Sequence, residues 1–295
     1  MPTVKTALVL AGGGSLGAVQ VGMLQALVET GIAFDLVVGA SVGAINGAYF
    51  AARPNAKGVD ELADFWRGLR QSDVFPFSIL DTLKGILNRR GHLLSASALQ
   101  RLVRRSLPVE LIEDTQLPLH IVTTNLLTGA EELLSSGNAE QALLASAAIP
   151  LVFPSVRVGE KFLVDGGVTS NTPIASAVAL GATRVVVLPT GFGCACLCPP
   201  KGLVALALHT LNLMSMRQLV RDIELYKARA AIHVVPPLCP LDASVFDFNQ
   251  TDQLLQRACH STKTWIEGGG LIRVGVPDSL LAHTHHVDDG GPSPG

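Results

Sequence analysis

The sequence predicts an α/β protein whose mainly parallel sheet is covered by helices on both faces. Short apolar segments alternate with helical segments, the pattern of parallel strands joined by crossover helices. Glycine-rich turns follow the first two apolar segments, and 48% of the 295 residues are hydrophobic. A chain of this size can bury roughly three-quarters of its unfolded surface in one large core.

The individual elements follow from where the apolar runs begin and end. We expect strands over residues 6–10, 35–38, 119–125, 162–164, 184–188 and 232–235. We expect helices over residues 16–29, 41–52, 59–69, 97–106 and 202–229. Because no internal repeat or long interior linker divides the chain, we expect one domain over 3–276. The Gly/Pro/Asp-rich residues 277–295 should form a disordered tail.

Charge and hydrophobicity exclude two broad classes of protein. Charged residues make up only 16% of the chain, and the formal net charge is -2. Such a chain is too apolar to be disordered. Its slight acidity gives no general attraction to nucleic acid, so no nucleic-acid partner is expected.

The first residues could be taken for a secretory signal, because one lysine precedes an apolar run. Gly12, Gly13 and Gly14 interrupt that run, however, so a strand, a glycine turn and a helix fit it better. The longest other uncharged stretch, residues 202–216, is shorter than the roughly 20 residues that cross a bilayer. Five cysteines, an odd number, argue for a reducing compartment. We therefore expect a cytoplasmic protein.

Two groups of residues have side chains of the types that bind metal ions. Cys194, Cys196 and Cys198 stand at alternate positions, a spacing that does not close the tetrahedral ligand set that zinc prefers. The histidines at 283–286 lie in the Gly/Pro/Asp tail, where a solvated end is the simpler interpretation. We expect no metal and no cofactor.

Residues 12–17, GGGSLG, follow the first strand and open a helix. Backbone N–H groups at the start of a helix favour an anion. The same letters fit the dinucleotide fingerprint, which also needs an acidic residue at the end of the next strand. The only nearby acid, Asp35, lies at the start of that strand. The dinucleotide-binding interpretation therefore lacks its second requirement, and a nucleotide-binding protein remains only as a minor alternative.

The second glycine turn reads Gly39-Ala40-Ser41-Val42-Gly43, between an apolar strand and a helical segment. This context is typical of a nucleophile elbow, in which glycines permit a tight turn that exposes the serine hydroxyl. The alternative is an ordinary glycine-rich turn with a capping serine. Parallel strands could place this turn beside the first one, so that one supplies a nucleophile and the other N–H donors.

A serine nucleophile needs a base, and Asp165 is the candidate. It follows the apolar strand residues 162–164 and precedes Gly166 and Gly167. Asp-Gly is also a common turn pair, so the motif alone does not decide between the two interpretations. An aspartate could take the proton of Ser41 only if the fold brings the two strand ends together.

Taken together, these motifs resemble the bacterial patatin-like phospholipases. The shared features are a GGGxxG turn, a GxSxG elbow about 25 residues later, and a DG[GA] motif in the second half of the chain. Residues 146–150, SAAIP, and the Phe-Pro pair at 153–154 precede the last motif. The resemblance covers roughly residues 6–188.

The resemblance implies a three-layer α/β/α sandwich with a Ser-Asp dyad that hydrolyses lipid acyl esters without a metal. By motif position it implies Ser41 as the nucleophile and Asp165 as the general base. The backbone of Gly12, Gly13 and Gly14 would form the oxyanion hole. The family commonly has Arg or Lys where this chain has Leu16, so a charge contribution of the loop to head-group binding is not expected to carry over.

An α/β-hydrolase triad is the mechanistic alternative, since His233, His260 and His283 all follow Asp165. That fold usually forms several strands before its elbow, whereas here only the strand at residues 6–10 precedes the elbow. A packed strand position for His233 and a helix-face position for His260 are the simpler interpretations.

Six cations and no acidic residue lie between residues 84 and 106, directly after an apolar stretch. Such a segment could seat the protein on an anionic lipid surface, at about 1 kcal/mol for each cation. The alternative is a covering segment with its apolar side on the core. The candidate lipid-surface contacts are Phe75, Phe77, Lys84, Arg89 and Arg90.

The sequence therefore predicts a serine acylhydrolase acting on phospholipid or lysophospholipid esters. Its expected partner is a lipid acyl ester, with peripheral contact at the inner membrane surface and a homo-oligomer left open. A second class remains, a membrane-associating or regulatory binding protein on the same fold with little turnover.

Overall fold

The computed structural model describes residues 4–74, 96–191, 203–241 and 247–281. One eight-stranded mixed sheet runs through it in the order β5-β6-β3-β2-β1-β7-β8, with β4 paired to β3. The parallel strands are β1 (Thr6–Leu10), β2 (Leu36–Ala40), β3 (Leu119–Asn125), β7 (Arg184–Leu188) and β8 (Ala231–Val234). The strands in antiparallel pairings are β4 (Glu131–Leu134), β5 (Val156–Val158) and β6 (Lys161–Asp165).

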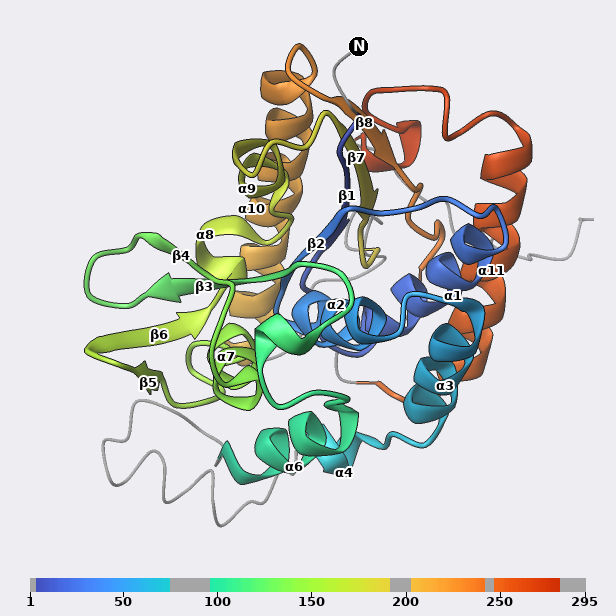
Figure 1. Cartoon of the computed structure of the whole chain (residues 1–295). Helices are drawn as coiled ribbons and strands as arrows, with labels where there is room; N and C mark the ends of the chain where they lie inside the picture. The colour runs from blue at the N-terminus through green and yellow to red at the C-terminus, as the bar shows by residue number, and fades with distance from the viewer. Residues whose placement is uncertain (1–3, 75–95, 192–202, 242–246, 282–295) are drawn as a thin grey trace, which may run out of the picture.

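Helices lie on both sides of this sheet, which gives the three layers of an α/β/α sandwich (Figure 1). One layer contains α1 (Gly17–Val28), α2 (Val42–Ala52), α3 (Ala56–Arg67), α6 (Ala96–Ser106), α7 (Ala139–Ser146) and α11 (Thr251–Glu267). The other contains α8 (Gly167–Ser170), α9 (Ile174–Ala179) and α10 (Leu203–Tyr226). The short elements are α4 (Gln71–Val74), η1 (Gly14–Leu16), η2 (Ile112–Asp114) and η3 (Asp278–Leu280).

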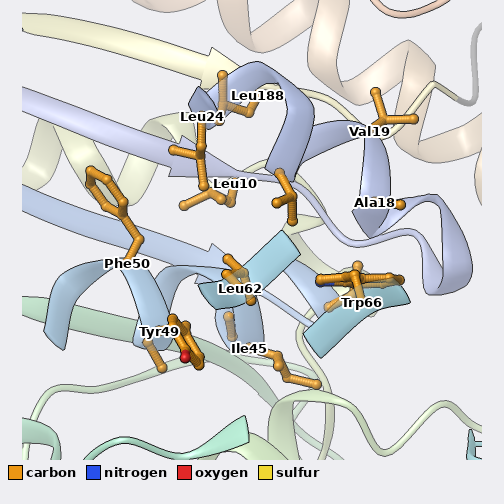
Figure 2. Packing of buried hydrophobic residues seen from close by; sticks show 14 of the residues in the cluster. Leu10, Ala18, Val19, Leu24, Ile45, Tyr49, Phe50, Leu62, Trp66 and Leu188 are labelled. Carbon is orange, nitrogen blue, oxygen red and sulfur yellow. The ribbon is translucent and has the colours of Figure 1, made fainter. Parts of the chain in front are cut away.

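Alternation along the strands produces two hydrophobic cores. Leu8 and Leu10 of β1 face the α1 layer, whereas Ala7 and Val9 face the α9 and α10 layer. All four side chains are fully buried, because a central parallel strand is covered on both faces. Figure 2 shows the first core, in which residues from β1, α1, α2 and α3 pack together.

The predicted α/β class and mainly parallel sheet are confirmed. Several elements were not predicted: the short strands β4 and β5, and the helices α7 and α9. For α11 the sequence indicated only a helix-face position for His260, without bounds. β4 reads Glu-Glu-Leu-Leu and is only partly buried, and β5 has only three residues. β4 lacks the apolar run and the alternation by which strands are recognised in a sequence, and β5 is too short for its alternation to be recognised.

The folded chain extends slightly past the expected domain end at residue 276. Asp278–Leu280 forms a short 3-10 helix, and Leu280 is buried against the second core. Residues 282–295 of the expected tail lie outside the described ranges. Among the helices of the described ranges, none combines the length and the apolar character that crossing a bilayer demands.

Candidate active site

Ser41 occupies the sharp turn between β2 and α2. Its backbone angles are φ 55° and ψ -127°, in a region that residues other than glycine rarely adopt. The side chain is only 6% exposed. A strained serine between a strand and a helix is the geometry of a nucleophile elbow.

The two glycines of the elbow are required by close backbone contacts. A Cβ atom on Gly39 would lie 2.5 Å from the carbonyl oxygen of Gly43. A Cβ on Gly43 would lie 2.3 Å from the carbonyl oxygen of Leu10 in β1. The G-x-S-x-G spacing thus follows from packing the start of α2 directly against the ends of two strands.

The Ser41 hydroxyl points at the carboxylate of Asp165. Its Oγ donates a 2.7 Å hydrogen bond to Oδ2, and the backbone N–H of Gly167 donates a 2.7 Å hydrogen bond to Oδ1. The structure therefore brings together the two side chains that the motifs singled out. It does so without an intervening histidine.

The strand that carries Asp165 reaches this edge from the opposite direction. Ala40, the last residue of β2, lies opposite Val122, and β3 continues past it to Asn125. Within β3, only this extension pairs with β6, in the antiparallel direction, and Asp165 lies opposite Thr123. The carboxyl end of an antiparallel strand therefore meets the carboxyl end of a parallel one.

Burial raises the pKa of Asp165 to about 6, while the hydrogen bonds from Ser41 and Gly167 partly oppose the rise. A carboxyl group with this pKa is mostly ionised at neutral pH. It is also a stronger base than an exposed aspartate, whose pKa is about 3.9. Asp165 can therefore accept a proton from a hydroxyl group beside it.

The glycine loop lies next to Ser41, and its backbone N–H groups differ in whether they already donate a hydrogen bond. A Cβ on Gly12 would stand 3.1 Å from Ser41 Cβ and 2.4 Å from Asn171 Oδ1, so this backbone passes close to the serine. The Gly12 N–H donates to the Asn171 carbonyl oxygen at 3.0 Å, and the Gly12 carbonyl accepts from Thr190 Oγ1 at 2.7 Å. The Gly12 N–H, which the resemblance implied as an oxyanion donor, therefore already donates to a carbonyl oxygen in this structure, and its catalytic role stays a prediction.

Gly13 and Gly14 retain the donor capacity that Gly12 lacks. No hydrogen bond within the described residues uses their N–H groups. Gly14 has φ 58° and lines the same pocket as Ser41. These two amides, just before α1, are the candidate oxyanion donors.

A network of buried side chains is hydrogen-bonded to Ala11, the residue directly before the glycine loop. Gln20 Nε2 donates to the carbonyl oxygens of Ala11 and Leu188, at 2.8 and 2.9 Å. Asn46 Nδ2 donates to Gln20 Oε1 at 3.0 Å, and the Trp66 indole N–H donates to Asn46 Oδ1 at 2.8 Å. No pattern in the sequence predicts this network, because its members come from three different helices.

An apolar pocket opens beside Ser41. Its walls come from α2, α3, α6 and the segment after α7, and its lining includes Ile45, Trp66, Leu99, Ile149, Phe153 and Phe248. The free volume is about 40 Å³, enough for one or two water molecules. A long acyl chain would therefore need the lining side chains to move apart.

Leu16, which stands where the family commonly has Arg or Lys, lies in the core. The Leu16 side chain is 2% exposed and belongs to the first hydrophobic core. The loop therefore presents no cation at this position.

Neither of the described histidines considered for a triad lies at the site. His233 is on β8, three strands from β2 or about 14 Å, and its Nδ1 lies 2.8 Å from the Arg273 carbonyl oxygen. His260, on α11, lines a separate surface groove with Trp265. His283 lies outside the described residues.

The candidate lipid contacts Phe75, Phe77, Lys84, Arg89 and Arg90 also lie outside the described residues, as do Cys194, Cys196 and Cys198. The end of the basic segment forms α6, which packs Leu102 and Val103 on the core. Arg104 pairs with Glu140 at 2.9 Å. Within the basic segment, α6 thus fits the alternative interpretation of a covering helix whose apolar side packs on the core. Nowhere in the described ranges do three or more His, Cys, Asp or Glu side chains gather in a way that could hold a metal ion.

Comparison with known proteins identifies relatives over the part of the chain that carries the site. The family model "Patatin-like phospholipase" matches residues 8–178, more than half of the chain. Mouse "Patatin-like phospholipase domain-containing protein 6" is 31% identical over 188 residues, covering 63% of this chain and 13% of the relative. An uncharacterized NTE family protein of Mycobacterium tuberculosis is 30% identical over 268 residues, covering 84% and 44%. The chain thus spans less than half the length of these relatives.

Two further matches bear on chemistry and fold. "Lysophospholipase nte1" of Aspergillus terreus is 30% identical over 184 residues, 62% of this chain and 12% of the relative. The structure of human GIVD cytosolic phospholipase A2 superposes with a TM-score of 0.52 at 10% identity, covering 91% of this chain and 62% of that one. At this identity the structural match speaks for the fold alone.

Proposed function

This chain belongs to the patatin-like phospholipase family, and on that premise we propose that it hydrolyses lipid acyl esters with Ser41 as nucleophile and Asp165 as general base. The 2.7 Å hydrogen bond from Ser41 Oγ to Asp165 Oδ2 is the observation that carries the proposal. It has the length at which a proton can pass during attack. The lysophospholipase name of one relative supports the substrate class.

The first half of the reaction forms an acyl-enzyme. Ser41 Oγ attacks the ester carbonyl carbon as its proton moves to Asp165. The resulting oxyanion accepts hydrogen bonds from the N–H groups of Gly13 and Gly14, each typically contributing about 2.7–4 kcal/mol to lowering the barrier. The tetrahedral intermediate then collapses, the ester C–O bond breaks, and Asp165 returns the proton to the leaving alcohol.

The second half regenerates the enzyme. Water attacks the acyl carbon while Asp165 takes its proton. The Ser41–acyl bond breaks, and the proton returns to Ser41 Oγ as the fatty acid leaves. One carboxylate serves as base and acid in both halves, which a pKa of about 6 permits near neutral pH.

The acyl group would occupy the apolar pocket beside Ser41. Its walls are aliphatic and aromatic side chains, which favour a hydrocarbon chain over a polar substituent. Since the loop presents Leu16 in the core and no cation there, we propose that the acyl chain contributes more to recognition than the head group does.

Covalent labelling tests the proposal directly. A fluorophosphonate probe should modify Ser41, located by peptide mass mapping. Hydrolysis of p-nitrophenyl esters, phospholipids and lysophospholipids should disappear in Ser41→Ala and Asp165→Asn. A matched control is Ser176→Ala, a buried serine on α9 outside the pocket, which should keep wild-type rates. Folded active enzyme with unlabelled Ser41 would contradict the assignment. Liposome binding without hydrolysis of any ester would instead favour the low-turnover binding protein.

We also propose that the protein meets its lipid substrate at the cytoplasmic face of a membrane. The proposal rests on the lipid-degrading family and on the basic, apolar composition of residues 75–106. Cell fractionation tests it: recovery in an extracellular or periplasmic fraction would contradict it. An oligomer remains a sequence prediction, which light scattering would check.

A further inference from the structure

Ser146, the last residue of α7, is fully buried between the two loops that carry Ser41 and Asp165. Its Oγ accepts a 2.9 Å hydrogen bond from the backbone N–H of Ser41. The same hydroxyl donates a 2.7 Å hydrogen bond to the carbonyl oxygen of Val122 in β3. The donor and acceptor functions of the hydroxyl are thus both committed, which fixes its orientation.

The backbone next to Ser146 holds the other loop. The Gly166 N–H donates to the Ser146 carbonyl oxygen at 3.3 Å, and the Asp165 N–H donates to the Ala148 carbonyl oxygen at 3.0 Å. One short segment, residues 146–148, is therefore hydrogen-bonded to both loops of the site.

We infer that Ser146 is a positioning residue that holds the Ser41 turn at the distance from Asp165 that the reaction needs. The inference rests on the proposed function, and it adds a residue that does not touch the substrate. It requires that the side chain of Ser146, rather than the general stability of α7, sets the position of Ser41.

The strain at Ser41 explains why an outside support is needed. A φ of 55° costs a serine roughly 1–2 kcal/mol, and such a turn persists only where its surroundings hold it. Removing the Ser146 hydroxyl leaves the buried N–H of Ser41 without its acceptor. The turn is then free to relax and to carry Oγ away from Asp165. A misplacement of about 1 Å can cost on the order of 100-fold in rate.

The decisive variant is Ser146→Ala, assayed with a soluble ester such as p-nitrophenyl butyrate. We expect kcat to fall on the order of 10- to 100-fold with KM nearly unchanged. The rate of fluorophosphonate labelling at Ser41 should fall in parallel. Ser146→Thr restores the hydroxyl and should recover part of kcat; if it does not fold, the alanine variant decides alone.

Two further measurements separate positioning from a structural role. Ser176→Ala also removes a buried, hydrogen-bonded hydroxyl, that of Ser176 to Glu131, but it should leave kcat per folded molecule unchanged. In Ser146→Ala the acidic limb of the pH profile should move to higher pH, because the Ser41 hydrogen bond that lowers the pKa of Asp165 is weakened. A loss of folded protein alone would change neither kcat per folded molecule nor the position of the acidic limb.

Each outcome has a defined meaning. Wild-type kcat and an unchanged pH profile in Ser146→Ala overturn the inference, as does a loss of rate that merely matches the loss of folded protein. If the wild-type protein itself neither hydrolyses esters nor is labelled at Ser41, the proposed function fails first, and with it the premise of the inference. Reduced kcat with a shifted limb in fully folded protein supports it.

Discussion

Ser41 Oγ and Asp165 Oδ2 lie 2.7 Å apart, although 124 positions of the chain separate the two residues. The second carboxylate oxygen is held by the Gly167 N–H. One oxygen therefore fixes the group in place, while the other faces the hydroxyl. Because the whole carboxylate is buried, its ionisation should control both the activity and the stability of the protein.

The rate of ester hydrolysis should rise with pH through an apparent pKa of about 6. Burial raises the pKa of Asp165 to that value, and only the ionised carboxylate can accept the Ser41 proton. The measurement is kcat/KM for a p-nitrophenyl ester between pH 4 and 8, with product read at a fixed alkaline pH. A limb near pH 4, where an exposed aspartate ionises, would contradict a buried base.

The family resemblance of the three motifs implied that Ser41 and Asp165 act together, but it did not give the path of the chain between them. Apolar runs before Gly39 and before Asp165 mark two strands, and both strands exist. The antiparallel direction of β6 could not be read from its sequence, because a buried strand looks the same in either direction.

Hydrogen bonds between distant segments were the other part that remained hidden. Gly12 was predicted as an oxyanion donor, yet its N–H donates to the Asn171 carbonyl oxygen. Any residue type can offer a backbone carbonyl, so no pattern marks Asn171. The same holds for Ser146, whose motif was visible but whose contact with the Ser41 N–H was not.

Asp165→Asn should inactivate the enzyme and stabilise it above about pH 6. The folded protein holds the Asp165 proton to about pH 6, whereas the unfolded chain loses it near pH 3.9. Stability from this group is therefore lost as pH rises from about 4 to about 6, in total on the order of 2–3 kcal/mol. Thermal unfolding should show equal Tm values for the two proteins near pH 4, and a variant higher by on the order of 5 °C at pH 7.5. A Tm difference that is independent of pH would show that the charge is not the cause.

Ser41→Gly should be more stable than Ser41→Ala, although both should be inactive. Glycine adopts φ 55° with little strain, whereas alanine keeps the cost of a Cβ atom. The larger entropy of glycine in the unfolded chain offsets part of this gain. We therefore expect the free energies of unfolding, measured by urea denaturation, to differ by about 0.5–1 kcal/mol.

Ser215, inside the long helix α10, supplies the matched pair for that comparison. At a regular helical position Ala should exceed Gly by about 1 kcal/mol, the reverse order. The same order at both positions would mean that Ser41 does not hold its strained conformation in solution.

Trp66→Phe should destabilise the protein through the buried amide network rather than through lost volume alone. The indole N–H donates to Asn46 Oδ1, and Asn46 is fully buried. Phenylalanine leaves that oxygen without its Trp66 donor, which costs about 1–3 kcal/mol in addition to the cavity. In Asn46→Leu the oxygen to which Trp66 donates is already gone, so adding Trp66→Phe to that variant leaves no further acceptor unsatisfied. A double-mutant cycle by urea denaturation should therefore show the pair costing about 1 kcal/mol less than the sum of the two single changes. Additive effects would mean that packing, and not the hydrogen bond, sets the position of this pocket wall.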